Sequence, residues 1–357
     1  MNQYFHFFFY ILLIIISSQL YICEILEIPL YNLKCAIQNK DSVKSLTLLD
    51  IKSNMTSLTE EFISSTDIKK EMDDDNKEYY EISSSNLLAG TNNSKLIPFT
   101  IISSIGHYPK LSLGRTYANE NCSLVYYLYN NKIIQNKSFS LSISHLPEQK
   151  LYLGGIPNNM IKNKTQIKIP TSEKYKSWAF PIDSISIGNL TFAINKLGLL
   201  GLDSGSIIVN REIYLFLKDN IFKDFLEKHI CYEEIWDKDS GANIYCSIND
   251  FPEFPLFYLN VNKGKDKIPI KISERDDREG FIDIAFNNEL HNSDYIWVDK
   301  MFFYQYDVLF DYNDHTISVY VDKVVSKKCS IKKYFVLINI FILLISCIVI
   351  GYYKIII

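Results

Sequence analysis

Apolar and polar side chains alternate with a period of two along much of the middle of the chain. The alternation is clearest over residues 137–144, 166–169 and 183–187, where it predicts strands. Helical spacing of apolar residues is found mainly over 211–229, and a second short helix is expected over 124–130. The pattern therefore predicts a mostly-β protein with a few short helices.

Two further segments complete this picture of the amino-terminal half. A first strand is expected over 27–33, directly after the apolar start of the chain. Residues 59–78 are densely charged and contain few apolar side chains, so we expect a solvated loop there.

Long apolar runs lie at both ends of the sequence. Residues 5–20 are almost wholly apolar and predict a secretory signal peptide over 1–22. Residues 334–353 are long enough to cross a bilayer at ~1.5 Å per residue and predict a transmembrane helix. A signal for a GPI anchor is the alternative, because small residues precede this run at Ser326, Cys329 and Ser330.

These ends place the expected body in the lumen or outside the cell, attached to a secretory-pathway membrane or to the cell surface. Six Asn-X-Ser/Thr sequons fit this route. The net charge is −4 and no segment is strongly basic, which argues against nucleic acid as a partner.

Seven cysteines fit an oxidising compartment. We expect Cys231 to pair with Cys246, because this bond closes a short loop within one half of the chain. The partners of Cys35, Cys122 and Cys329 are left open. Because the histidines are scattered and no Cys-X-X-Cys motif occurs, we expect no metal and no cofactor.

The most informative motif is Asp-Ser-Gly-Ser at residues 203–206. An apolar run leads into it and the apolar residues 207–209 follow at once. A carboxylate on a tight glycine turn between two buried strands supplies half of a two-carboxylate hydrolytic site. The motif therefore points to Asp203 as a candidate catalytic residue.

Five groups of residues after residue 138 agree in order and spacing with one family of proteins. They are Phe139–Ser144 with Leu151–Ile156, Ser177–Trp178 with Asp183–Gly188, Leu202–Ser206, Cys246–Pro255, and Tyr306–Asp311 with Ile317–Tyr320. In these segments the chain resembles the pepsin-like aspartic proteases. The resemblance implies a mostly-β, bilobal fold with double-psi β-barrel-type lobes and a cleft between them. It also implies an abbreviated amino-terminal lobe over 23–165 and a carboxy-terminal lobe over 166–325.

The same resemblance implies a second aspartate from the amino-terminal lobe. The best candidate is Asp50, with Ser53 as a supporting residue, although Asp50-Ile51-Lys52 stands in place of Asp-Thr-Gly. Ser112 and Val298 also stand where glycines are expected. Tyr80 is the candidate for the tyrosine of the flap over the substrate.

The chemistry of this family needs two carboxylates about 3 Å apart that share a proton and hold a water. One carboxylate activates the water and the other polarises the peptide carbonyl. The resemblance gives Ser204, Gly205 and Ser206 supporting roles, since the hydroxyl cross-links the two turns and the glycine lets them approach.

Two functions follow from these residues. The first is a membrane-anchored aspartic endopeptidase that hydrolyses peptide bonds with Asp50 and Asp203. The alternative is a catalytically inactive pseudoprotease that binds a peptide or protein in the cleft, because Ile51 and Lys52 do not fit the catalytic turn. Either function predicts a monomer with a peptide or protein partner.

Overall fold

The computed structural model describes most of the chain between its two apolar ends. The described residues are 25–30, 34–38, 44–50, 56–58, 68–72, 78–89, 95–105, 110–115, 123–143, 149–175, 177–202, 207–237, 241–247, 257–270, 281–287, 293–298 and 300–323. Contacts between Cα atoms divide the chain into a unit over Met1–Val321 and a second over Asp322–Ile357.

Both predicted membrane-related segments, 1–22 and 334–353, lie outside the described residues. Within the described part of the chain, no helix combines the length and the apolar composition that a membrane span requires.

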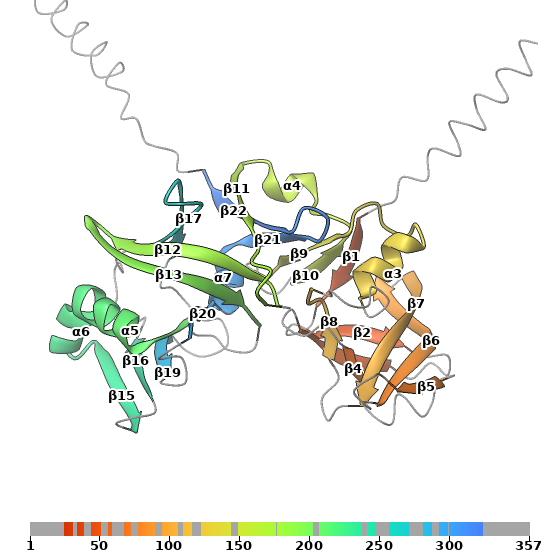
Figure 1. Cartoon of the computed structure of the whole chain (residues 1–357), viewed down its shortest axis with the longest axis horizontal. Helices are drawn as coiled ribbons and strands as arrows, with labels where there is room; N and C mark the ends of the chain where they lie inside the picture. Colours follow the sequence, from red (N-terminus) through yellow and green to blue (C-terminus); the bar gives the residue numbers. More distant parts are fainter. Residues whose placement is uncertain are drawn as a thin grey trace, which may run out of the picture. The chain divides into compact units, whose positions relative to one another are not determined.

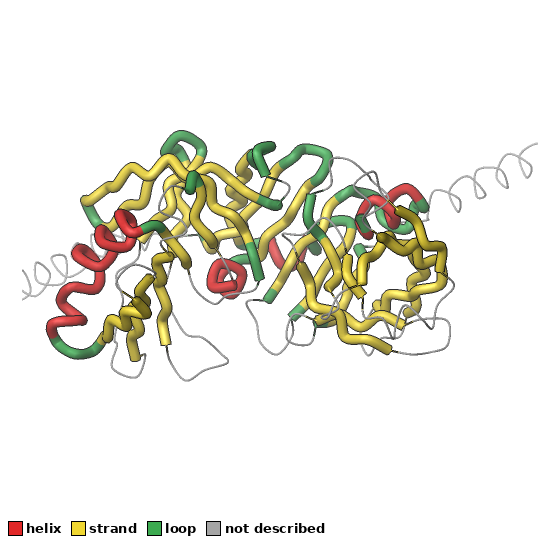
Figure 2. The backbone as a smooth tube through the Cα atoms, turned by 60° about the horizontal axis from the view of Figure 1, so that its bottom comes forward, coloured by secondary structure: helices red, strands yellow, loops and turns green. Residues whose placement is uncertain are grey.

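The protein is mostly β, as predicted, and its strands form three sheets (Figures 1 and 2). The first is a six-stranded sheet with residues from both ends of the described chain. Its order is β1 (Leu26–Pro29), β10 (Lys150–Leu153), β9 (Ser138–Ser142), β21 (Asp307–Asp311), β22 (Thr316–Asp322) and β11 (Lys164–Pro170). Every residue of β9 is buried, and Phe139 stacks on Phe310 of β21 at 4.5 Å between ring centroids. Non-local contacts therefore hold this sheet together.

The second sheet has seven strands and lies between residues 34 and 112. Its order is β2 (Lys34–Gln38), β3 (Lys44–Asp50), β8 (Lys110–Ser112), β4 (Thr56–Leu58), β7 (Lys95–Ile105), β6 (Glu78–Ala89) and β5 (Ile68–Met72). An additional pairing of β2 with β6 closes six of these strands into a ring, with β5 attached outside it. Closure of this kind removes free strand edges.

The loop expected over 59–78 is partly wrong, because β5 lies within it. The strand pairs with β6 from Ile68 opposite Ile82 to Met72 opposite Glu78. It is the outermost strand of its sheet, a position where charged side chains are common. Pairing with a neighbouring strand thus outweighs the polar composition of the segment.

The third sheet has nine strands from residues 179–298. Its order is β15 (Cys231–Asp237), β16 (Gly241–Ser247), β19 (Phe281–Asn287), β14 (Ile207–Val209), β20 (Tyr295–Val298), β13 (Leu190–Leu200), β12 (Ala179–Ile187), β17 (Phe257–Val261) and β18 (Asp266–Ile270). The hairpin of β12 and β13 is its longest pairing (Figure 1).

The strand predictions over 137–144, 166–169 and 183–187 are confirmed by β9, β11 and β12. The first strand is shorter than expected and ends at Pro29.

Both predicted helices are present. The first, α3, covers Leu124–Asn130. The second is continuous through α5 (Arg211–Leu217), a π-helical turn at Lys218–Phe222 and α6 (Lys223–Glu227). The Asn210 side chain caps α5 by accepting a hydrogen bond from the Ile213 amide at 3.0 Å. The short helices α4 (Asn158–Ile161) and α7 (Lys300–Gln305) were not predicted.

Candidate functional site

A unit of four strands occurs twice, once in each of the two larger sheets. The orders are β3-β8-β4-β7 and β13-β20-β14-β19. In both units the second strand is parallel to the first and antiparallel to the third. The third strand is parallel to the fourth in both units as well. The two halves of the chain therefore share one local topology.

The register of the two units can be compared directly. Val298 of β20 lies opposite Leu200 on one side and Ile207 on the other. Leu111 of β8 lies opposite Leu49. Because Lys110 pairs with Ser57 in the antiparallel direction, the same register brings Leu111 opposite Thr56.

Six residues separate the paired positions in each unit. They are Asp50 to Met55 in the amino-terminal unit and Gly201 to Ser206 in the carboxy-terminal unit. Counting along both, the third residue is Lys52 in one and Asp203 in the other, and the fourth is serine in both. By this register the counterpart of Val298 is Leu111. Ser112 and Val298, where the resemblance expects glycines, are therefore not equivalent positions, because Ser112 lies one residue after that counterpart.

Only part of the predicted catalytic set lies in the described residues. Asp50 is the last residue of β3 and pairs with Ser112. Residue 202, a buried leucine, is the last described residue before the Asp-Ser-Gly motif. Ser53, Asp203, Ser204, Gly205 and Ser206 lie outside the described residues.

The flap candidate Tyr80 lies on β6, opposite Lys70 of β5 and Ser103 of β7. It is therefore in a strand that has a neighbour on each side.

Cys231 is disulfide-bonded, and the register of β15 and β16 brings Cys246 directly opposite it. Directly opposed residues of an antiparallel pair are separated by about the Cα distance that a disulfide requires. The pairing of these two cysteines stays a prediction that the register favours.

The segment that continues β8 is anchored by residues from distant parts of the chain. Its residues 113–115 are buried. The carbonyl of Leu113 accepts a hydrogen bond from Trp178 Nε1 at 2.8 Å and another from Tyr312 Oη at 2.9 Å. Burial raises the pKa of the Tyr312 phenol well above its ordinary value of 10.0, so it stays a donor.

Arg115 completes this anchor. Its guanidinium is buried, donates to the Ser172 carbonyl at 2.6 Å and lies 5.7 Å from the centroid of the Trp178 ring. Sequence motifs indicate Trp178 but neither Arg115 nor Tyr312. The available signal for Arg115 was that it is one of only four arginines in a lysine-rich chain.

A second polar cluster lies beside β20. The carboxylate of Asp294 accepts hydrogen bonds from Lys174 Nζ and Tyr175 Oη. Those hydrogen bonds hold the pKa of Asp294 below its ordinary value of 3.8. Desolvation, reinforced by the hydrogen bond to Asp294, raises the pKa of Tyr175 to about 12.

No group of three or more His, Cys, Asp or Glu residues close enough to hold a metal ion occurs within the part of the chain that the structure describes.

No protein-family model matches the chain, and no curated protein sequence matches it either.

Proposed function

We propose that the chain has the bilobal fold of the pepsin-like aspartic proteases and binds an extended peptide between its halves without hydrolysing it. The observation that carries this proposal is the repeat of one four-strand unit around two six-residue connections. In this proposal each connection contributes one turn to a shared site, as the sequence resemblance implies. The six-stranded sheet, with strands from both halves, supports the same fold.

The register favours binding over hydrolysis. The residue that corresponds to Asp203 in the other unit is Lys52, followed by Ser53 and Asn54 where Ser204 and Gly205 stand. Asparagine is the residue that most often replaces glycine where φ is positive, so Ser53 and Asn54 fit the kind of turn that the sequence resemblance implies. The lysine does not, because an ammonium cannot share a proton with a carboxylate as a second carboxylate does.

Aspartic endopeptidase activity is the second candidate, with Asp50 and Asp203 as the dyad. The position of Asp50, which ends β3 and is the first residue of the connection, favours it. For Asp50 to act in this way, its carboxylate has to reach the place of Lys52, two residues further along the chain.

The proposal keeps the cellular setting that the sequence implies. The body is anchored to a secretory-pathway membrane or to the cell surface, by a transmembrane helix or a GPI anchor, and acts as a monomer. Its partner is an extended peptide or a protein segment with apolar side chains.

A substitution that restores a carboxylate tests the proposal. The full chain, purified in detergent, is mixed with fluorogenic peptides at pH values from about 3.5 to 7, and binding of a labelled statine-type peptide is measured in parallel. We expect the wild type to bind the statine peptide and to cleave nothing. We expect Lys52→Asp to gain cleavage that the statine peptide inhibits, and Lys52→Asp with Asp203→Asn to lose it again.

The Asp50→Asn variant is the matched control. Cleavage by the wild type that disappears in Asp50→Asn would support the endopeptidase and overturn the binding proposal. Failure of a folded chain to bind the statine peptide would contradict the peptide site itself.

A further inference from the structure

One buried residue, Trp178, makes hydrogen bonds to both halves of the chain. It directly precedes β12, and its side chain is fully buried. The indole Nε1 donates to the Leu113 carbonyl at 2.8 Å. The backbone carbonyl of Trp178 accepts from the Leu200 amide at 2.9 Å. Trp178 therefore joins Leu113 of the amino-terminal half to Leu200 of the carboxy-terminal half.

Both partners of Trp178 lie beside one of the two six-residue connections. Leu113 directly follows β8, and Ser112 of that strand pairs with Asp50, the first residue of the amino-terminal connection. Leu200 ends β13 and directly precedes the carboxy-terminal connection. The path from one connection to the other through Trp178 thus contains one side-chain hydrogen bond, which a substitution can remove.

A second contact joins the same two segments. The guanidinium of the buried Arg115 donates to the Ser172 carbonyl at 2.6 Å, and the Ser172 amide donates to the Ala179 carbonyl at 2.8 Å. Ala179 is the first residue of β12 and follows Trp178 in the chain. Two buried side chains, one from each segment, therefore hold residues 113–115 against the start of β12.

We propose that Trp178 is a positioning residue that fixes the two connections relative to one another, with Arg115 in support. This inference rests on the proposed function, since the two connections are the turns of the proposed peptide site. A site made of two turns binds tightly only while both keep the separation that suits the ligand. A looser pair spends part of its time in arrangements that do not bind, and the affinity falls by that fraction.

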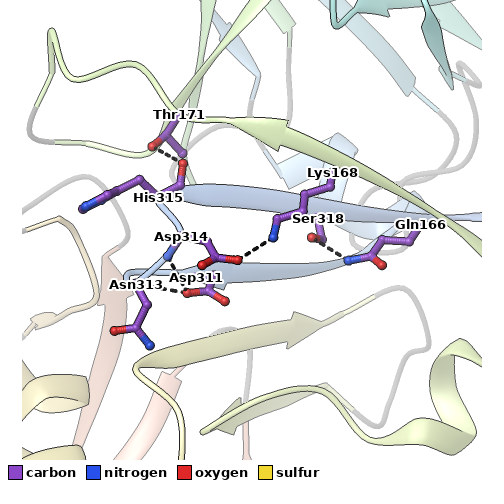
Figure 3. Close-up of polar contacts among 8 residues, drawn as sticks. All are labelled: Gln166, Lys168, Thr171, Asp311, Asn313, Asp314, His315 and Ser318. Carbon is purple, nitrogen blue, oxygen red and sulfur yellow. Dashed lines mark hydrogen bonds and ion pairs between the residues drawn. The ribbon is translucent and has the colours of Figure 1, made fainter.

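Tyr312 supplies the matched control. Its hydroxyl donates to the same Leu113 carbonyl at 2.9 Å, but it belongs to the turn between β21 and β22. This turn is held by contacts of its own, since the Asp311 carboxylate accepts hydrogen bonds from two backbone amides within it (Figure 3). Tyr312→Phe therefore removes one donor from Leu113 and leaves the path through Trp178 in place.

The first measurement is hydrogen–deuterium exchange of the full chain in detergent, and it needs no ligand. Trp178→Phe removes the indole donor and keeps an aromatic ring. We expect it to speed exchange of the Leu200 amide roughly fivefold, because the carbonyl that this amide binds has lost the restraint of one hydrogen bond. Tyr312→Phe should leave the Leu200 amide within about twofold of the wild type. Rates are compared with those of β17 in the same sheet, which corrects for global unfolding.

The second measurement is the affinity of each variant for the labelled statine-type peptide. Trp178→Phe should weaken binding roughly fivefold, whereas Tyr312→Phe should stay within about twofold of the wild type. A role confined to anchoring Leu113 would move both variants alike. Arg115→Met removes the contact with Ser172 and should act in the same direction as Trp178→Phe, so it replaces that variant if it does not fold.

The two measurements separate this inference from the proposed function. A wild type that does not bind the peptide would contradict the peptide site, and exchange at Leu200 would still decide whether Trp178 joins the two connections. Equal exchange at Leu200 in Trp178→Phe and Tyr312→Phe would overturn the inference. Unchanged affinity of a folded Trp178→Phe, in a protein whose wild type binds, would overturn it as well.

Discussion

The buried carbonyl of Leu113 accepts from two side chains, so removing the donors singly and together tests how the β8 segment is anchored. Tyr312→Phe removes one donor and leaves Trp178 Nε1 at 2.8 Å. We expect it to lower the free energy of unfolding by ~1 kcal/mol, the usual net value of one hydrogen bond. Trp178→Phe should cost ~2 kcal/mol, because it also removes apolar area from a fully buried position.

The double variant should cost more than the sum of the two single variants. With both donors gone, the buried carbonyl loses both side-chain partners, and the additional penalty is ~1–3 kcal/mol. Urea unfolding of the purified chain, followed by far-ultraviolet circular dichroism, measures all three values without relying on the fluorescence of Trp178. Costs that add to within ~0.5 kcal/mol would show that the carbonyl does not depend on these two donors.

Three further predictions concern stability. Lys164→Met should lower the free energy of unfolding by ~3–5 kcal/mol, because it leaves the buried Asp307 carboxylate without the ammonium at 2.5 Å. Adding Asp307→Leu should recover much of this loss in the same urea assay. Gly198→Ala should lower the free energy of unfolding by ~1–3 kcal/mol, because an added Cβ would lie 2.8 Å from Ile182 Cδ1. Ile182→Val should relieve this crowding, as thermal unfolding of the single and double variants would show. An unchanged midpoint in the single variant would contradict the crowding. The pKa of Asp294 is lowered in the folded state, so its carboxylate stabilises the fold above its ordinary pKa of 3.8, and this stabilisation is lost as the pH falls through the lower folded value. Asp294→Asn should therefore flatten the acid side of a curve of unfolding free energy against pH. An unaltered slope would contradict the stabilising role of Asp294.

Local pattern predicted much of this fold because several strands pack one face on the core. The strand over 166–169 alternates in burial as it alternates in sequence. In β9 and β12 the period of two predicted the strand correctly, although every residue of β9 is buried and residues 183–187 of β12 do not alternate in burial. The helix from Arg211 was predictable for a similar reason, since its apolar residues recur at helical spacing after an asparagine cap.

Features that depend on pairing with distant strands could not be predicted in this way. The charged strand β5 has no apolar alternation and forms because β6 offers it an edge. The correspondence of Lys52 with Asp203 follows only from the register of β8 and β20. The sequence motifs placed the glycine position of β8 at Ser112, whereas the register makes Leu111 the counterpart of Val298. Arg115 and Tyr312 lie 197 positions apart in the chain, and each contacts Trp178, so no pattern among their sequence neighbours predicts that they belong to one cluster.

The six-stranded sheet has a consequence for how the protein is made. Its first strand, Leu26–Pro29, is among the earliest parts of the body to be synthesised, while β22 ends at Asp322. The sheet cannot be complete until nearly the whole chain has left the ribosome. Until the last hairpin is made, β9 lacks its neighbour β21, and an unpaired strand edge of this kind favours aggregation during synthesis.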